Sequence, residues 1–133
     1  LGAEEIFAGY QRHTEVKDIN AECWRGLINM HSIDLKRDLA IAKHFNSTLL
    51  VPFLDRELIK TAMTIKGNLK LKNGHKKYIF REVAEKLGLP KEFSWRKKVA
   101  AQYGSGVDKQ IGKLAKKNGF KYKKDYLESL LKI

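Results

Sequence analysis

Apolar residues recur at steps of three and four along most of this chain, and this spacing restricts the fold more than any other feature. Such a period places apolar side chains on one face of an α-helix. It predicts helices over residues 4–10, 16–31, 33–45, 56–65, 77–87, 108–118 and 126–131. A buried extended run is predicted at residues 49–54, and no second strand signal appears. The fold class should therefore be mostly α.

Polar residues near the predicted helix starts support these boundaries. Ser32, Asp55 and Asp125 stand where a side-chain oxygen can accept a hydrogen bond from a first-turn N–H. Gly88 is placed to end a helix in the left-handed conformation. Residues 66–76 contain glycines, asparagines and four lysines, which predicts a surface loop.

The length of 133 residues suits one domain, and we expect residues 1–133 to form a single helical fragment of a longer protein. Leu1 enters a predicted helix with nothing before it to pack. No apolar run approaches the roughly 20 residues of a membrane span, and a signal-peptide pattern is lacking at residues 1–20. These features favour a cytoplasmic protein with no membrane partner.

Cysteine and histidine residues show no spacing typical of a metal site. The single cysteine, Cys23, lies in a predicted helix beside Trp24 and is interpreted as a small core residue. The four histidines at positions 13, 31, 44 and 75 are interpreted as surface or helix-end residues.

The net charge of +12 is concentrated in one stretch of the chain. Residues 66–124 carry 18 Lys and Arg against 4 Asp and Glu, whereas residues 1–65 carry 8 against 9. A cationic field of this kind attracts nucleotide phosphates, nucleic acid or an acidic protein surface. A solvated lysine-rich surface is the alternative.

A segment inside the basic stretch has the composition of a polyphosphate site. It begins with Arg96, Lys97 and Lys98 and continues to a Gly-Ser-Gly turn at residues 104–106. Glycine lets a backbone approach an anion closely, and the first N–H groups of the following helix are unpaired donors. The alternative is a loop whose lysines face water.

Three segments, in this order, resemble the C-terminal part of asparagine synthetases. They are Gly2-Ala3-Glu4-Glu5-Ile6-Phe7-Ala8-Gly9-Tyr10, then Val51-Pro52-Phe53-Leu54-Asp55, then Lys77 through Arg81 followed by Trp95-Arg96-Lys97-Lys98. The segment Leu35-Lys36-Arg37-Asp38 is similar too. The resemblance implies the helical C-terminal portion of an adenine nucleotide alpha-hydrolase-like (PP-loop ATP pyrophosphatase) α/β domain. The sheet-bearing N-terminal portion, with its Ser-Gly-Gly-x-Asp-Ser loop, is absent from these residues.

The resemblance also implies roles for individual residues. Glu4 matches the acidic position that binds Mg²⁺, Lys77 matches a phosphate-binding lysine, and Lys98 matches the lysine that stabilises charge at the reacting phosphoryl group. These residue types suit the chemistry, because a hard cation prefers carboxylate oxygen and a charged transition state prefers fixed cations. Further candidates for binding ATP or pyrophosphate are Arg96, Ser105 and Gly106.

The implied activity is ATP-dependent amide formation. A small aspartate-like carboxylate would be adenylated with release of pyrophosphate, and ammonia would then attack. We expect the fragment alone to be inactive, because the pyrophosphate loop lies outside it. Its uncovered helices should leave apolar surface exposed, which favours a homo-oligomer.

The sequence departs from the family pattern at positions that bear on this activity. Glu4 replaces the usual aspartate, Leu1 stands at an acidic position, and Thr48 and Leu50 stand where the family has Glu-x-Arg. A helical interaction domain that kept the fold without the chemistry is therefore an alternative function. A basic RNA- or DNA-binding module is another, although the aromatic residues of the basic stretch form no stacking platform signature.

Overall fold

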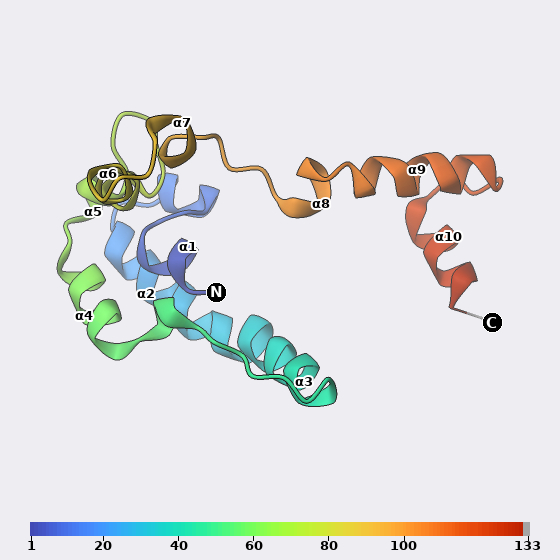
Figure 1. The fold of residues 1–133 in the computed structure, drawn as a ribbon, viewed down its shortest axis with the longest axis horizontal. Coiled ribbons are helices and arrows are strands. Elements are labelled where there is room, and N and C mark those ends of the chain that lie inside the picture. The colour runs from blue at the N-terminus through green and yellow to red at the C-terminus, as the bar shows by residue number, and fades with distance from the viewer. Residues whose placement is uncertain (132–133) are drawn as a thin grey trace. The chain divides into compact units, whose positions relative to one another are not determined.

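The computed structural model describes residues 1–131, apart from the Gln102 side chain, as helices joined by turns and loops (Figure 1). Within residues 1–131 there is no β-strand, and an isolated antiparallel bridge joins Lys72 and His75. The predicted mostly α fold class is confirmed for this part of the chain. The chain divides into two compact units, Leu1–Trp95 and Arg96–Ile133. That residues 1–133 form one domain stays a prediction.

The first unit is built around α1, which contacts α2 and α4. Its elements are α1 (Ala3–Ile6), a 3-10 turn (Gln11–Thr14), α2 (Ile19–Met30), a π-helical turn (His31–Leu35), α3 (Lys36–His44), a second 3-10 turn (Pro52–Leu54), α4 (Arg56–Thr64), α5 (Gly67–Lys70), α6 (Tyr78–Lys86) and α7 (Lys91–Ser94). Ile6, Phe7 and Ala62 form the buried core cluster. The Phe7 ring stacks on the Phe80 ring of α6 with 5.0 Å between centroids. Leu27 of α2 also packs against the cluster, so the core joins α2, α4 and α6 to α1.

The second unit contains a pair of contacting helices, α9 and α10. Its elements are α8 (Ala101–Gly104), α9 (Val107–Lys117) and α10 (Lys123–Leu130). Gly106, with φ of 76°, precedes α9 as predicted, and Gly119, with φ of 78°, follows it. The Phe120 ring, in the connection between the two helices, lies 5.7 Å from the Tyr126 ring of α10.

The predicted helix break at Ser32 is wrong. The chain stays helical from α2 through the π-helical turn into α3, and the Ser32 hydroxyl donates to the Asn29 carbonyl at 3.0 Å. A π-turn keeps the backbone hydrogen-bonded while it admits one extra residue, so no cap is needed there. At the start of this long helix, the cap is Asp18, whose carboxylate accepts from the Ala21 N–H at 2.9 Å.

Two further segment predictions need correction. The run at residues 49–54 is not a buried extended plug, because it ends in a 3-10 turn and Leu50 is 81% exposed. Pro52 begins that turn, where its missing N–H costs nothing. The predicted surface loop at residues 66–76 contains the short helix α5, and Lys70 at its end is fully buried.

The predicted caps had mixed outcomes. Asp55 caps α4 as expected, because its carboxylate accepts from the Leu58 N–H at 2.9 Å. Gly88 adopts the expected left-handed conformation after α6, with φ of 98°. Asp125 is not a cap: α10 begins at Lys123, with Tyr122 at the N-cap and Asp125 in the first turn.

The exposure of individual side chains tests several further predictions. Cys23 is fully buried, as a core residue should be. His13 is fully buried as well, so it is not a surface residue, although it does lie in the last turn of the 3-10 helix Gln11–Thr14. The predicted exposed apolar side chains are present, with Phe45 72% and Leu87 83% exposed. Among residues 1–131, no helix is both long and apolar enough to cross a membrane.

Candidate functional site

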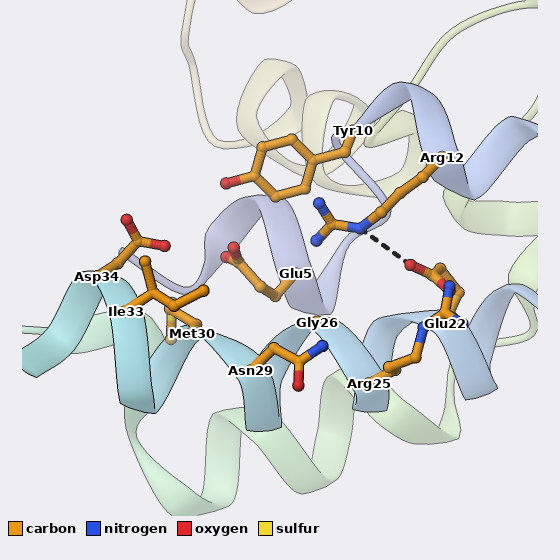
Figure 2. Close-up of a pocket in the computed structure, with 10 residues that line it drawn as sticks. All are labelled: Glu5, Tyr10, Arg12, Glu22, Arg25, Gly26, Asn29, Met30, Ile33 and Asp34. Carbon is orange, nitrogen blue, oxygen red and sulfur yellow. Dashed lines mark ion pairs between the residues drawn. The ribbon is translucent and has the colours of Figure 1, made fainter.

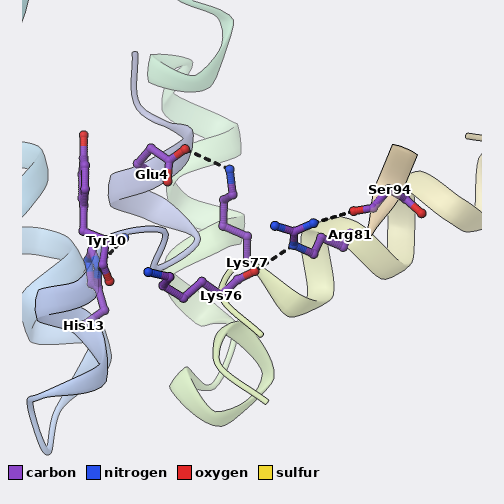
Figure 3. A network of polar contacts seen from close by, with 7 residues as sticks. All are labelled: Glu4, Tyr10, His13, Lys76, Lys77, Arg81 and Ser94. Atoms are coloured by element: carbon purple, nitrogen blue, oxygen red, sulfur yellow. Dashed lines mark hydrogen bonds and ion pairs between the residues drawn. The ribbon is translucent and has the colours of Figure 1, made fainter. Parts of the chain in front are cut away.

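Two of the predicted site residues, Glu4 and Lys77, meet in the first unit. The Lys77 Nζ lies 2.9 Å from the Glu4 Oε1, and the two side chains are only 16% and 18% exposed. They are 73 residues apart in the sequence, so the fold and not local spacing brings them together. Figure 3 shows the pair between α1 and the segment that leads into α6.

The backbone around α1 fixes the position of the Glu4 carboxylate. Gly2, at the N-cap of α1, has φ of 93°, a conformation that favours glycine. A Cβ on Gly9 would collide with the Glu4 carboxylate, so the absence of a side chain there leaves room for Glu4. The two glycines thus explain why this acidic residue lies inside the fold when helix starts usually expose their acids.

Lys77 is held in place by its backbone and by a neighbouring arginine. It caps α6 in the left-handed conformation, with φ of 56°, which is uncommon for a residue with a side chain. The Arg81 Nε donates to the Lys76 carbonyl at 3.0 Å, and the Arg81 Nη1 donates to the Ser94 carbonyl at 2.7 Å. Arg81 therefore ties the turn before α6 to α7, as Figure 3 shows.

The charge of this site suits a phosphate and a hard cation. The mostly buried carboxylate and ammonium neutralise each other, and removing either one would leave an uncompensated charge away from water. Among residues 1–131, no group of three or more His, Cys, Asp or Glu is arranged to hold a metal ion. Mg²⁺ usually takes one or two protein carboxylates and completes its coordination with water and substrate phosphate. The single carboxylate of Glu4 fits that requirement.

The other predicted site residues, Arg96, Lys98, Ser105 and Gly106, belong to the second unit. Arg96 and Lys98 lie in the loop between α7 and α8. The Val107 N–H donates to the Ser105 Oγ at 3.4 Å, so this helix-start donor already has an acceptor. The anion-binding role of the Gly-Ser-Gly turn stays a prediction.

A pocket of about 450 Å³ in the first unit was not predicted from the sequence (Figure 2). Residues of α1, the first 3-10 turn, α2 and the π-helical turn line it. Inside it, the buried Glu22 carboxylate pairs with Arg12 at 2.9 Å and with Arg25 on the next helical turn. A helix-interior glycine, Gly26, was the available signal, because glycine disfavours a helix. Its missing side chain lets the Arg12 guanidinium lie against α2.

Tyr10 closes one side of this pocket. The Arg12 guanidinium lies over the Tyr10 ring, 4.1 Å from the centroid, in a cation–π contact. Burial, with the charge and hydrogen bond of Glu5 adding to it, raises the pKa of Tyr10 to about 12. Burial also lowers the pKa of His13, whose Nδ1 accepts from the Tyr10 backbone N–H at 3.2 Å. Tyr10 therefore stays protonated at neutral pH and can act only as a neutral hydrogen-bonding group.

Comparison with known proteins gives the family of this helical chain. The model of the family described as asparagine synthase matches residues 11–119. The chain belongs to the asparagine synthase family.

Individual relatives agree with this assignment. The chain is 32% identical over 97% of its length to a putative glutamine-hydrolyzing asparagine synthetase of Methanocaldococcus jannaschii, of which it covers 31%. It is 32% identical over 80% of its length to asparagine synthetase B of Escherichia coli, of which it covers 20%. An asparagine synthetase of Saccharomyces cerevisiae gives 32% identity over 80% of the chain and 21% of the relative. The chain thus spans a third or less of these relatives, and no solved structure matches it.

Proposed function

We propose that this chain is the helical C-terminal portion of a PP-loop ATP pyrophosphatase domain in an asparagine-synthetase-like ligase. The complete protein would adenylate a small, aspartate-like carboxylate with ATP, release pyrophosphate, and form an amide when ammonia attacks. The chain alone would be inactive, because the pyrophosphate loop belongs to the remaining part of the domain. That part would also cover the apolar side chains that the helices leave exposed.

The contact between Glu4 and Lys77 is the observation that carries this proposal. The resemblance assigned Glu4 to Mg²⁺ and Lys77 to phosphate, and these are roles that require neighbouring groups. The structure places the two charged groups 2.9 Å apart. An unrelated helical protein would have no reason to hold these two positions together in a mostly buried pair.

The charged residues would act through their charges. Glu4 would hold Mg²⁺, which offsets negative charge on the phosphates of ATP. Lys77 would supply a fixed cation to a phosphate oxygen. Lys98 would stabilise the negative charge that develops at the reacting phosphoryl group, with Arg96, Ser105 and Gly106 binding ATP or pyrophosphate beside it.

The first test compares adjacent lysines in the complete protein. Lys77→Met should reduce ATP–pyrophosphate exchange by roughly 10²-fold, the usual cost of removing one stabilising charge from a phosphoryl-transfer site. Lys76→Met is the matched control, because the Lys76 Nζ donates to the Gln11 side chain at 3.3 Å and not to Glu4. Equal exchange rates in the two variants, with both folded by circular dichroism, would contradict the proposed site.

A second comparison tests the catalytic lysine. Lys98→Ala should reduce turnover by roughly 10²-fold while ATP binding weakens much less, because the lysine acts mainly when charge develops. Lys97→Ala and Arg96→Ala are the controls. A solvated lysine run predicts small and equal effects at Lys97 and Lys98, and that result would remove Lys98 from the mechanism.

A further inference from the structure

Lys70, at the end of α5, is a fully buried lysine whose neighbours are sulfur atoms. The Lys70 Nζ lies 4.0 Å from the Cys23 Sγ of α2 and 3.8 Å from the Met63 Sδ of α4. Cys23 is fully buried too. Among residues 1–131, the polar contacts of the Lys70 Nζ are these two sulfur atoms, and neither is a carboxylate.

This environment favours the uncharged forms of both groups. A lysine is almost never fully buried without a charged partner, because an isolated ammonium is strongly disfavoured away from water. Burial lowers the pKa of Lys70, and burial raises the pKa of the Cys23 thiol. Both shifts favour the neutral amine and the neutral thiol, and a neutral amine has a lone pair available for bonding.

We propose that Cys23 and Lys70 form a modification site, at which dioxygen links the thiol sulfur to the amine nitrogen through one oxygen atom. The thiol S–H and one amine N–H are lost, and an S–O and an O–N bond form. The second oxygen atom of dioxygen leaves as water with the two released hydrogens. Sulfur and nitrogen each give up two electrons, and dioxygen accepts all four.

The geometry favours an oxygen bridge over a direct S–N bond. The two atoms are 4.0 Å apart, and an inserted oxygen spans more of that distance than a direct bond does, so the helices need to move less. Dioxygen is small and apolar, which suits a site closed to solvent. The link would join α2 to α5 across 47 residues, and closing such a loop restricts the unfolded chain and stabilises the folded one.

The inference does not depend on the proposed ligase activity, and its test needs no enzyme assay. The complete protein is purified in air and, separately, without oxygen, and its proteolytic peptides are analysed by mass spectrometry under non-reducing conditions. In air, the Cys23 and Lys70 peptides should appear joined, with a mass greater than their sum by one oxygen minus two hydrogens. Two molecules of dithiothreitol supply the four electrons that return the thiol, the amine and one water.

Matched variants separate this link from ordinary cysteine oxidation. Lys70→Met and Cys23→Ala should each abolish the joined peptide, and Lys70→Met should keep its Cys23 thiol free in air. Met63→Leu removes the second sulfur and should leave the link intact. Separate peptides with a free thiol in air would overturn the proposal. So would equal thiol loss in the wild type and Lys70→Met, or a joined mass that lacks the oxygen atom.

Discussion

The two units of this chain treat their charged residues in opposite ways. In the first unit, Glu5, Glu22 and Lys70 are buried, and Glu4 and Lys77 form a mostly buried pair. In the second unit, by contrast, the described lysine side chains lie on the surface or pair with exposed acids. Ala115 is the only buried residue among its described side chains.

This difference matters for function because a charge acts more strongly where water is excluded. An ion pair near the surface contributes little, since solvent and salt screen it. A buried group cannot be screened in this way, so its partner and its position determine its chemistry. The first unit therefore holds the charged groups whose removal should have large effects on stability. Substitutions in each unit test that contrast.

Truncation of one apolar side chain in each unit should give the largest difference. Ile6→Ala should reduce the free energy of unfolding by about 2–5 kcal/mol, because Ile6 is fully buried in the core cluster. Leu114→Ala in α9 should cost about 1 kcal/mol or less, because that side chain is 45% exposed. Urea unfolding and amide hydrogen exchange, read separately in α2 and α9, measure the two costs. Similar values would mean that the second unit has a core as tight as the first.

The buried lysine should destabilise the first unit at neutral pH. Lys70→Met, measured without oxygen, should raise the free energy of unfolding by about 1–4 kcal/mol, as when a buried ionisable group is replaced by an apolar one of similar volume. The unfolded lysine titrates near 10.5 and the folded pKa is lower, so the unfolded state binds more protons between these values. Wild-type stability should therefore rise as pH increases toward 10.5, and Lys70→Met should lack that rise. If the stability of the wild type and of Lys70→Met depended on pH in the same way, Lys70 would remain protonated in the core.

Two aspartates near helix starts provide a smaller comparison. Asp55→Ala should cost about 1 kcal/mol, because the carboxylate accepts from the Leu58 N–H at 2.9 Å. Asp125→Ala should cost less than about 0.5 kcal/mol, because Asp125 lies within the first turn of α10 and Tyr122 occupies the cap. Thermal unfolding of both variants, with hydrogen exchange in α4 and α10, separates the two. A loss of 1 kcal/mol at Asp125 would show that helix-dipole and cap effects are comparable here.

The sequence predicted the structural features that depend on residues close together in the chain. Helical segments follow from apolar spacing over a few turns. Asp55 caps the start of α4 and Gly88 follows the end of α6, each with a hydrogen bond to a residue three positions away. Ser32 failed for a physical reason, since a π-turn satisfied the backbone and made a cap unnecessary. Asp125 failed because helix starts are uncertain by a residue or two when several polar residues are adjacent.

The parts of the site that depend on tertiary contacts could not be predicted from residue spacing alone. The pairing of Glu4 with Lys77 crosses 73 residues, and only the family resemblance indicated that both belong to one site. The burial of Lys70 could not be predicted, because glycine, asparagine and lysine around it are typical of a surface loop. The Arg12–Glu22 pair was also missed, because its two residues lie on different elements and meet only in the folded protein.

The smallest expected effect should differ in sign between the two units. In α9, Lys113 lies four residues from both Lys109 and Lys117, and like charges at this spacing repel by a few tenths of a kcal/mol. Lys113→Gln should therefore stabilise α9 slightly at low salt, because lysine and glutamine have similar helix propensities. In α4, Lys60 pairs with Glu57 at 2.8 Å, so Lys60→Gln should destabilise that helix by a similar amount. Salt should reduce both effects, since both charges are exposed. Hydrogen exchange of α9 and α4 amides at low and high salt shows whether each substitution stabilises or destabilises its helix. If Lys113→Gln were destabilising at low salt, the lysines of α9 would have an anionic partner within the folded protein, and the contrast between the units would no longer hold.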